Sequence, residues 1–286
     1  MPSMIQPTFF VIGAAKSGSS SLCELISQHP DICFSNPKEP KFFSHDENFS
    51  KGWQWYQKFF VGGENAIAIG DGSVHYSMRT IFPQTASRIS GALDGIKIIY
   101  IVRHPLDRIV SHWMMYQRSG NPKFTTFNQD VRREYLRPTL VDASNYWFQI
   151  NAYRDFLPDN QILIVFFEDF VTNPEREVRK CFEFLTLNTR VNLFNPRLVR
   201  NAANKRPEKP ILKSLRSFEL FEKVCAKAPV HLKYWLKSTF FLGPAPLDIE
   251  APQWEPDTRT WIMEHLLEDT RMFLNFYGKE ERYWTF

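Results

Sequence analysis

An apolar run breaks into a turn of small residues in the stretch Phe9-Phe10-Val11-Ile12-Gly13-Ala14-Ala15-Lys16-Ser17-Gly18-Ser19-Ser20-Ser21, and a helical pattern follows. We interpret this layout as a buried strand, a phosphate-binding loop and the start of a helix. Small residues let backbone N–H groups approach an anion, and the helix dipole favours negative charge at this end. The sequence therefore predicts a phosphate-like ligand here. Its candidate binding residues are Ala15, Lys16, Ser17, Gly18, Ser19, Ser20 and Ser21.

The loop differs from that of nucleotide-hydrolysing P-loop enzymes, in which four residues separate a glycine from Gly-Lys-Ser/Thr. Gly13 and Gly18 have this separation, but Ser19 stands where the lysine would be, and Lys16 lies inside the loop. The pattern predicts a loop that binds a nucleotide phosphate without gripping a magnesium-bound β,γ-phosphate pair. The alternative is an ordinary Gly/Ser turn between a core strand and a surface helix.

A second turn from strand to helix follows the apolar run 97–102 and reads Arg103-His104-Pro105-Leu106-Asp107-Arg108-Ile109-Val110-Ser111. Its proline suits the first turn of a helix. We expect Arg103 at the carboxyl end of a buried strand, where parallel sheets bind ligands, with Ser111 about two helical turns further on. Both residues are candidates for binding an anion. The alternative is a surface pair between Arg103 and Asp107.

Taken together and in this order, these motifs resemble those of sulfotransferases that use 3′-phosphoadenosine 5′-phosphosulfate (PAPS). The chain is more similar to the carbohydrate (heparan-type) and bacterial branch than to the cytosolic steroid and phenol branch. The resemblance extends over about two-thirds of the chain and is poor after Lys209. It implies that the segment from Gly13 to Leu22 binds the 5′-phosphosulfate and that Arg103 to Ser111 binds the 3′-phosphate. Further matching blocks are His29-Pro30-Asp31, Lys38-Glu39-Pro40-Lys41-Phe42-Phe43, Ser144-Asn145-Tyr146-Trp147 and Gln161 to Asp169.

The resemblance implies that the block around Glu39 supplies the catalytic carboxylate, so Glu39 is our candidate general base for an acceptor hydroxyl or amine. Sulfuryl transfer needs an in-line base and positive charge on the departing oxygens. Lys16 would stabilise the charge on the bridging oxygen. Lys38 and Lys41 would lower the pKa of Glu39 and burial would raise it, and the sequence leaves this balance open. A solvated charged turn is the alternative.

A second candidate base is His75, within the segment Gly70-Asp71-Gly72-Ser73-Val74-His75-Tyr76. Residues 67–69 read as a short core strand, so this segment should also emerge at the carboxyl edge of the sheet and face the acceptor. A structural histidine is the alternative. The candidate acceptor-binding residues are Lys41, Asp71, Ser73, His75 and Tyr146.

The segment Val199–Pro207 has the character of the loop that closes over the nucleotide in the resembling family. Its basic side chains suit a phosphate, and arginine can bind one with two parallel hydrogen bonds. Asn201, Lys205 and Arg206 are therefore candidates for binding the 3′-phosphate. A plain basic surface loop is the alternative.

Strand-like and helix-like segments alternate along the chain, which predicts an α/β three-layer sandwich with a central parallel sheet and a P-loop-like nucleotide site. We expect a single domain over 1–286, with the less well matched segment 210–286 packing on it and able to cover the acceptor site. Asp257 to Tyr277 should be a helix packed on the sheet. The expected strands lie near 9–13, 67–70, 97–102 and 161–167, and helices are expected at Ser20–Gln28, Leu106–Arg118 and Pro174–Leu185.

Charge, cysteine content and the lengths of apolar segments narrow the kinds of ligand and cellular compartment expected for this chain. The formal net charge of +4 is modest and suggests an anionic ligand rather than a nucleic-acid partner. Four scattered cysteines have no metal-binding spacing and predict core thiols in a reducing compartment. No N-terminal apolar segment reaches signal or membrane-span length, so we expect no stable membrane insertion and a cytoplasmic rather than a Golgi-anchored enzyme.

The sequence thus predicts a sulfotransferase that moves a sulfuryl group from PAPS to a hydroxyl or amine by in-line displacement, without a metal. The product would be adenosine 3′,5′-bisphosphate (PAP). A small metabolite is the favoured acceptor and a carbohydrate is the alternative, while the oligomeric state stays open. Two other classes remain: a P-loop kinase, which would need a magnesium carboxylate and a lysine at position 19, and a non-catalytic nucleotide-binding module.

Overall fold

The computed structural model describes residues 5–121, 123–195 and 250–286. They belong to a compact unit made of Met1–Leu198 and Ala251–Phe286. The second unit, Val199–Glu250, lies outside the described residues apart from its last residue, and so do the candidate nucleotide-loop residues Asn201, Lys205 and Arg206. A single domain over the whole chain therefore stays a prediction.

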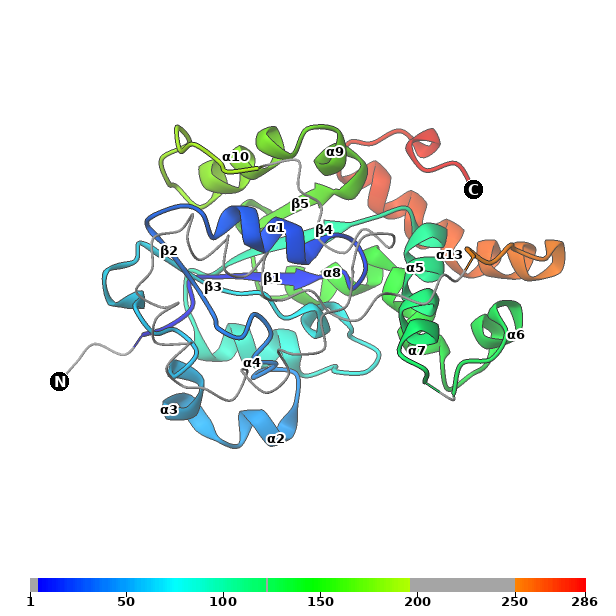
Figure 1. Cartoon of the computed structure of the whole chain (residues 1–286), viewed down its shortest axis with the longest axis horizontal. Helices are drawn as coiled ribbons and strands as arrows, with labels where there is room; N and C mark the ends of the chain where they lie inside the picture. Colours follow the sequence, from blue (N-terminus) through cyan, green and yellow to red (C-terminus); the bar gives the residue numbers. More distant parts are fainter. Residues whose placement is uncertain (1–4, 122, 196–249) are drawn as a thin grey trace, which may run out of the picture. The chain divides into compact units, whose positions relative to one another are not determined.

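Five parallel strands form the sheet at the centre of the described unit (Figure 1). Their order is β2-β3-β1-β4-β5. The chain places β2 and β3 on one side of β1 and then crosses to the other side for β4 and β5. Such a reversal leaves a ligand-binding crevice at the carboxyl ends of the strands beside it, here β1 and β4. The strands are β1 (Phe9–Gly13), β2 (Ile32–Phe34), β3 (Ala68–Asp71), β4 (Lys97–Val102) and β5 (Ile162–Phe166).

Both faces of the sheet are buried because successive side chains of a strand point to opposite sides. Phe10 and Ile12 of β1 pack in one core cluster, with side chains of α4 (Thr85–Ala92), α8 (Tyr146–Arg154) and α13 (Pro256–Phe276). Phe9 and Val11 pack in a second cluster, with α1 (Ser19–Ile26) and α10 (Pro174–Phe184). These helices form the two outer layers (Figure 1), so the predicted three-layer α/β fold is confirmed.

A third cluster anchors α5, which follows β4. Trp113 of α5 donates a hydrogen bond from Nε1 to Asp130 Oδ2 at 2.8 Å, and Ile262 and Leu266 of α13 complete the cluster. This packing fixes the helix that carries Ser111. The helices of this region are α5 (Pro105–Arg118), α6 (Phe127–Arg132) and α7 (Arg137–Leu140), and the other short ones are α2 (Asp46–Phe49), α3 (Gly52–Gln57) and α9 (Phe167–Thr172).

The carboxyl-terminal helix α13 packs on the sheet layer, as expected for Asp257 to Tyr277. Phe273 is fully buried, with its ring centroid 6.1 Å from that of Phe166 in β5. Asp269 accepts hydrogen bonds from the backbone N–H groups of Trp147 and Phe148 at 3.0 and 2.8 Å. Because these groups begin α8, a carboxylate from α13 caps the neighbouring helix.

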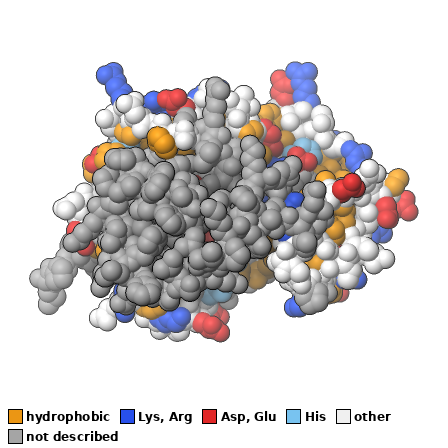
Figure 2. All heavy atoms as spheres, in the orientation of Figure 1, with side chains coloured by type: hydrophobic (Ala, Val, Ile, Leu, Met, Phe, Trp, Pro, Cys, Tyr) orange, Lys and Arg blue, Asp and Glu red, His pale blue; other side chains and the backbone are white. Residues whose placement is uncertain are grey.

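The cysteines, possible metal ligands, helices and surface charges of the described residues can be compared with the class of protein expected from the sequence. Burial raises the pKa of Cys23 to about 11, and Cys181 is fully buried as well, so both are core thiols. No three His, Cys, Asp or Glu side chains of the described residues gather as metal ligands would, and no helix among them is long and apolar enough to cross a bilayer. On the face in Figure 2, acidic and basic described side chains are interspersed.

Candidate active site

Two glycines hold the loop between β1 and α1 in place. Gly13 has φ +147°, and a Cβ there would lie 2.2 Å from Ser77 Oγ. Gly18 has φ +88°, and a Cβ there would lie 2.9 Å from the ring of Phe167. Between them Lys16 also has a positive φ of 72°. The backbone is thus packed tightly against neighbouring side chains at both ends of the loop. This packing fixes the direction of the backbone N–H groups between Gly13 and Gly18.

The loop hydroxyls are largely withdrawn from solvent. Ser17, Ser19 and Ser21 are buried. The Ser17 hydroxyl lies beside the phenol of Tyr146 but makes no hydrogen bond of good geometry within the part of the chain that the structure describes. A buried hydroxyl without a satisfactory partner carries a free-energy cost that a bound anion would relieve. The predicted phosphate-binding residues therefore lie together, with capacity left for a ligand.

Arg103 stands at the carboxyl end of β4, as predicted. Its guanidinium lies 4.8 Å from the ring centroid of Phe167, and Nη2 is 3.6 Å from Asp107 Oδ2. Its Nε is buried and has no hydrogen-bond partner among the described residues. The ion pair that the sequence left as an alternative is thus present, but it leaves a donor of Arg103 unused. Ser111 is partly exposed on α5.

Phe167 joins the two anion-binding segments, and sequence reasoning missed it. Its ring faces both Gly18 and Arg103. Its position directly after the last strand of the sheet was the available signal, because that edge is where ligands bind. A substitution of Phe167 would therefore disturb both segments at once.

Tyr146 lies at Arg103, although it was expected at the acceptor. Its fully buried hydroxyl donates to the Arg103 carbonyl at 2.7 Å and accepts from the Arg103 N–H at 3.4 Å. Burial raises the pKa of Tyr146 to about 12, so the phenol stays neutral. This geometry gives Tyr146 a positioning role for the turn after β4.

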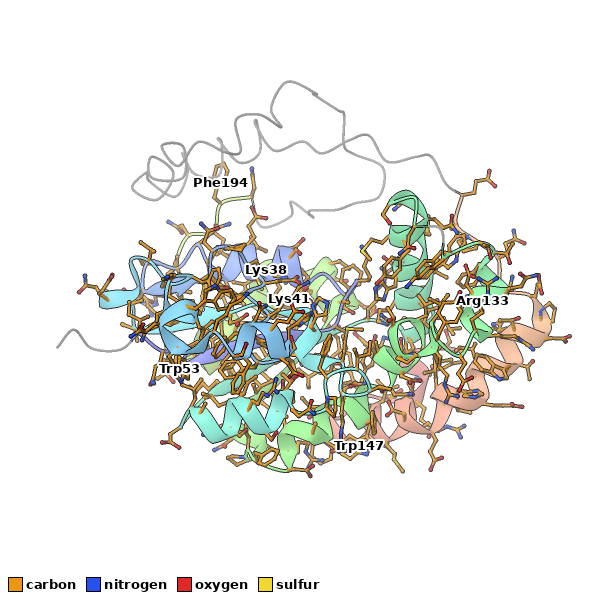
Figure 3. All side chains as sticks on the ribbon, turned by 90° about the horizontal axis from the view of Figure 1, so that it is seen from below. Lys38, Lys41, Trp53, Arg133, Trp147 and Phe194 are labelled. Atoms are coloured by element: carbon orange, nitrogen blue, oxygen red, sulfur yellow. The ribbon has the colours of Figure 1, made fainter. Side chains whose placement is uncertain are left out.

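Glu39 lies next to the first turn of α1. Lys38 Nζ is 3.3 Å from Ser19 Oγ and 3.3 Å from Glu39 Oε1, and Glu39 Oε2 is 3.8 Å from His75 Nδ1. The Glu39 side chain is 30% exposed, which leaves room for an acceptor to reach it. Lys38 and Lys41, labelled in Figure 3, both belong to the segment between β2 and α2. The structure thus brings both candidate bases to the phosphate-binding loop, through a lysine that the sequence analysis treated only as a neighbour.

His75 is a weak base in this setting. Burial, followed by the positive charge of Lys41 and the neighbouring His45 imidazole, lowers the pKa of His75 to about 4. At neutral pH its contact with Glu39 is therefore one between a carboxylate and a neutral imidazole, and not an ion pair. The lowered pKa removes the usual advantage of an imidazole as a base, so the choice of Glu39 rests on its link to the loop through Lys38.

His45 and Phe82 pack around His75, which contacts Glu39, and neither was predicted. The His45 ring stacks on Phe82 with centroids 4.7 Å apart and meets the His75 ring edge-on at 5.3 Å. Burial lowers the pKa of His45. Uncharged rings therefore flank the carboxylate on the His75 side.

Asp71 is the centre of a buried hydrogen-bond network beneath the segment that carries Glu39. It is fully buried and accepts hydrogen bonds from Tyr56, Ser73 and Tyr76, at 2.6, 2.7 and 2.8 Å. Ser73 Oγ and Tyr76 OH in turn accept from the backbone N–H groups of Lys41 and Phe43, at 3.1 and 3.3 Å. Asp71 and Ser73 were expected to touch the acceptor; the structure places them beneath the segment that carries Glu39.

The comparison with known families agrees with this geometry. The model of the sulfotransferase domain family matches residues 6–224. The chain belongs to the sulfotransferase family. The match includes the loop after β1, Glu39 and the turn after β4, so all three parts of the site lie inside the family domain of this sulfotransferase.

Curated relatives match this sulfotransferase over about two-thirds of its length. The mouse heparan sulfate glucosamine 3-O-sulfotransferase 5 is 26% identical over 201 residues, which cover 66% of this chain and 56% of the relative. The human bifunctional heparan sulfate N-deacetylase/N-sulfotransferase 2 is 26% identical over 203 residues, 65% of this chain and 22% of that protein. The chain therefore spans about half or less of these relatives.

Solved structures share the fold. A sulfotransferase from Alicyclobacillus acidocaldarius has a TM-score of 0.69 and 24% identity, covering 98% of this chain and 99% of its own. The mouse sulfotransferase SULT7A1, solved in complex with PAP, has a TM-score of 0.50 and 19% identity, covering 93% and 85%. At these identities the likeness concerns the fold alone.

The Asp71 network of this sulfotransferase predicts a pH-dependent contribution to stability. Burial raises the pKa of Asp71 from 3.8 to about 6, against the opposing effect of its three hydroxyl donors. The folded state then binds more protons than the unfolded state between these values, so the contribution is present below pH 4 and is lost as the pH rises through 6. At most, this amounts to about 3 kcal/mol.

Urea unfolding of the wild type and Asp71→Asn between pH 4 and 7.5 measures this contribution. We expect the wild type to lose about 3 kcal/mol of unfolding free energy relative to the variant as the pH rises. The difference between the two proteins is used because His75, whose pKa is lowered, has the opposite pH dependence. Asp94→Asn controls for the loss of an exposed carboxylate. A difference that does not vary with pH would contradict the prediction.

Proposed function

We propose that this sulfotransferase transfers the sulfuryl group of PAPS to a hydroxyl or amine, with Glu39 as the general base. One observation carries the proposal: Lys38 links the Glu39 carboxylate to Ser19, at the start of the helix after the phosphate-binding loop. A base and an anion site thus lie side by side, as in-line transfer requires. Family membership supports the same reaction.

The donor site combines two segments that suit the two ends of PAPS. The loop from Ala15 to Ser19 offers backbone N–H groups, Lys16 and buried hydroxyls for the 5′-phosphosulfate. Arg103 has a buried Nε without a partner, which suits the 3′-phosphate together with Ser111. That a mouse protein of this fold was solved with PAP supports the assignment.

Each side chain has a distinct part in the proposed reaction. Glu39 takes the proton of the acceptor as the acceptor's oxygen or nitrogen bonds to sulfur. The bond between sulfur and the bridging oxygen breaks, and Lys16 stabilises the charge that develops on that oxygen. Neutral His75 can orient the carboxylate or the acceptor by hydrogen bonding, since Nδ1 has no partner in the described structure.

Two acceptor classes have separate support. The matched relatives are named for heparan sulfate, which favours a carbohydrate. The uncharged rings of His45, His75 and Phe82 beside Glu39 favour a small acceptor with an apolar or aromatic body, the class preferred from the sequence. Assays with labelled PAPS on a glucosamine oligosaccharide panel and on a panel of small phenols and alcohols distinguish them.

Calorimetry with PAP, without metal, tests the donor site directly. We expect removal of the 3′-phosphate, giving AMP, to weaken binding by about 10- to 100-fold, because charge-assisted hydrogen bonds to Arg103 are lost. Binding of magnesium-ATP as tight as that of PAP would instead assign the chain to the kinases. Binding of neither nucleotide would contradict the proposed activity and leave a non-catalytic role.

A further inference from the structure

Arg108, on α5 beneath the phosphate-binding loop, is the feature that the proposed reaction has not used. Its side chain is fully buried. Nε donates to Ser144 Oγ at 2.5 Å and Nη2 donates to the Leu140 carbonyl. Nη1 lies 3.1 Å from His112 Nδ1 and 3.5 Å from the carbonyl oxygen of Ala15, in the loop itself.

None of these partners is a carboxylate, and no ion pair found among the described residues includes Arg108. Buried charges are ordinarily paired, since burial without a counter-charge is costly. Burial lowers the pKa of Arg108, yet an arginine side chain in a protein stays protonated. The interior below the loop therefore holds a positive charge that only neutral groups solvate.

His112 shows that this charge acts together with that of the loop lysine. Burial, then the charges of Arg108 and Lys16, lowers the pKa of His112 well below its usual value. The imidazole is therefore neutral, and its Nδ1 can accept the hydrogen bond from Arg108. The positive charges of Arg108 and Lys16 thus act on the same neighbourhood.

The contact with Ala15 also sets the orientation of a peptide group. In a trans peptide the C=O and N–H groups point in opposite directions. Because the Ala15 carbonyl faces Arg108, the following N–H, that of Lys16, points away from α5. Lys16 has φ +72°, a conformation that a side chain rarely adopts without support from its surroundings.

We propose that Arg108 is a positioning residue for the 5′-phosphosulfate end of the donor. It holds the Ala15–Lys16 peptide in the anion-binding orientation and supplies a buried positive charge, without touching the ligand. Its helix also carries Ser111 and begins beside Arg103, so Arg108 ties the two anion-binding segments together. The inference rests on the proposed function, because it assumes that the loop binds the 5′ end of PAPS.

Affinities for three nucleotides test the proposal by calorimetry: PAP, AMP, and adenosine 3′-monophosphate, which lacks the 5′-phosphate. Arg108→Lys should weaken PAP and AMP by about tenfold, and Arg108→Gln, which also removes the charge, by about a further tenfold. The affinity for adenosine 3′-monophosphate should change by less than about threefold in both. Arg103→Gln should give the opposite pattern, with AMP the least affected.

Two further variants guard against an effect of misfolding. Ser144→Ala leaves the charge of Arg108 in place and removes only the partner of Nε, so we expect a milder loss with the same preference for 5′-phosphorylated ligands. Arg154→Lys, at an arginine of α8 that pairs with Asp159 at 2.7 Å, is the matched control. Unfolding midpoints are measured alongside the affinities.

The possible results separate this inference from the proposed function. Wild-type protein that fails to bind PAP would overturn the proposed function and this inference with it. Wild-type binding with unchanged PAP affinity in both Arg108 variants would overturn only the inference. So would an equal loss for all three nucleotides, because a purely structural arginine does not distinguish the two ends of the ligand.

Discussion

Glu39→Gln is expected to lower kcat by about 10²- to 10⁴-fold, the usual contribution of a positioned general base. The amide keeps the shape of the side chain but cannot take the proton from the acceptor. The affinity for PAP should stay within about threefold of the wild type, because in the proposed reaction Glu39 contacts the acceptor and not the nucleotide. Steady-state assays with labelled PAPS, together with calorimetry on PAP, measure the two effects.

Glu47→Gln is the matched control, since Glu47 is exposed on α2. His75→Asn tests the competing assignment, and we expect a loss of no more than about tenfold, because the lowered pKa of about 4 leaves His75 a poor proton acceptor at neutral pH. Near-normal turnover of Glu39→Gln, together with a large loss of turnover in His75→Asn, would make His75 the general base in place of Glu39.

Four of the five strands of the described unit, and its helices α1, α5, α10 and α13, could be predicted to within one or two residues from the sequence. The apolar run at 97–102 is β4, and the helix expected at Leu106–Arg118 begins only one residue earlier, at Pro105. Strands buried on both faces are continuous apolar runs, and proline marks a helix start, so the signals are local. The strand β2 was missed because Ile32–Phe34 is too short for a pattern to emerge.

The parts of the site were predictable, but not their connections. Glu39, His75 and the loop come from three segments, and Lys38 links the first to the loop only through tertiary packing. The burial of Asp71 was equally unpredictable from the sequence. An acidic residue directly after a strand fits an exposed ligand contact as well as the buried centre of a hydrogen-bond network. Only the folded neighbourhood, with three hydroxyl donors, distinguishes these roles.

Arg108 is a further residue whose burial and contacts could not be predicted from the sequence. In the sequence it is one cation in a charged helix start, and nothing separates it from the candidate anion-binding Arg103 or from a surface residue. Its full burial and its contact with the Ala15 carbonyl follow from how α5 packs against the loop and against α7. Contacts between residues so far apart in the chain have no local signature.

Lys16→Met is expected to lower kcat/KM for PAPS by about 10²- to 10³-fold, comparable to removing one preorganised group that stabilises charge in a transition state. Lys16 sits inside the loop, between Gly13 and Gly18, whose backbone is packed tightly against neighbouring side chains. Affinity for PAP should fall as well, by about tenfold, because in the proposed complex the same cation would contact the 5′-phosphate of the product. This joint loss distinguishes Lys16 from Glu39, whose removal should spare binding.

Lys58→Met, at an exposed lysine after α3, is the matched control for the loss of one positive charge. If Lys16→Met retains near-normal turnover, Lys38 is the remaining cation that contacts both Ser19 and Glu39. A double variant that replaces both Lys16 and Lys38 then shows whether the two lysines act on the same charge. Additive losses would mean that the two lysines act on different atoms, whereas a double loss no larger than the greater single loss would mean that they act on the same developing charge.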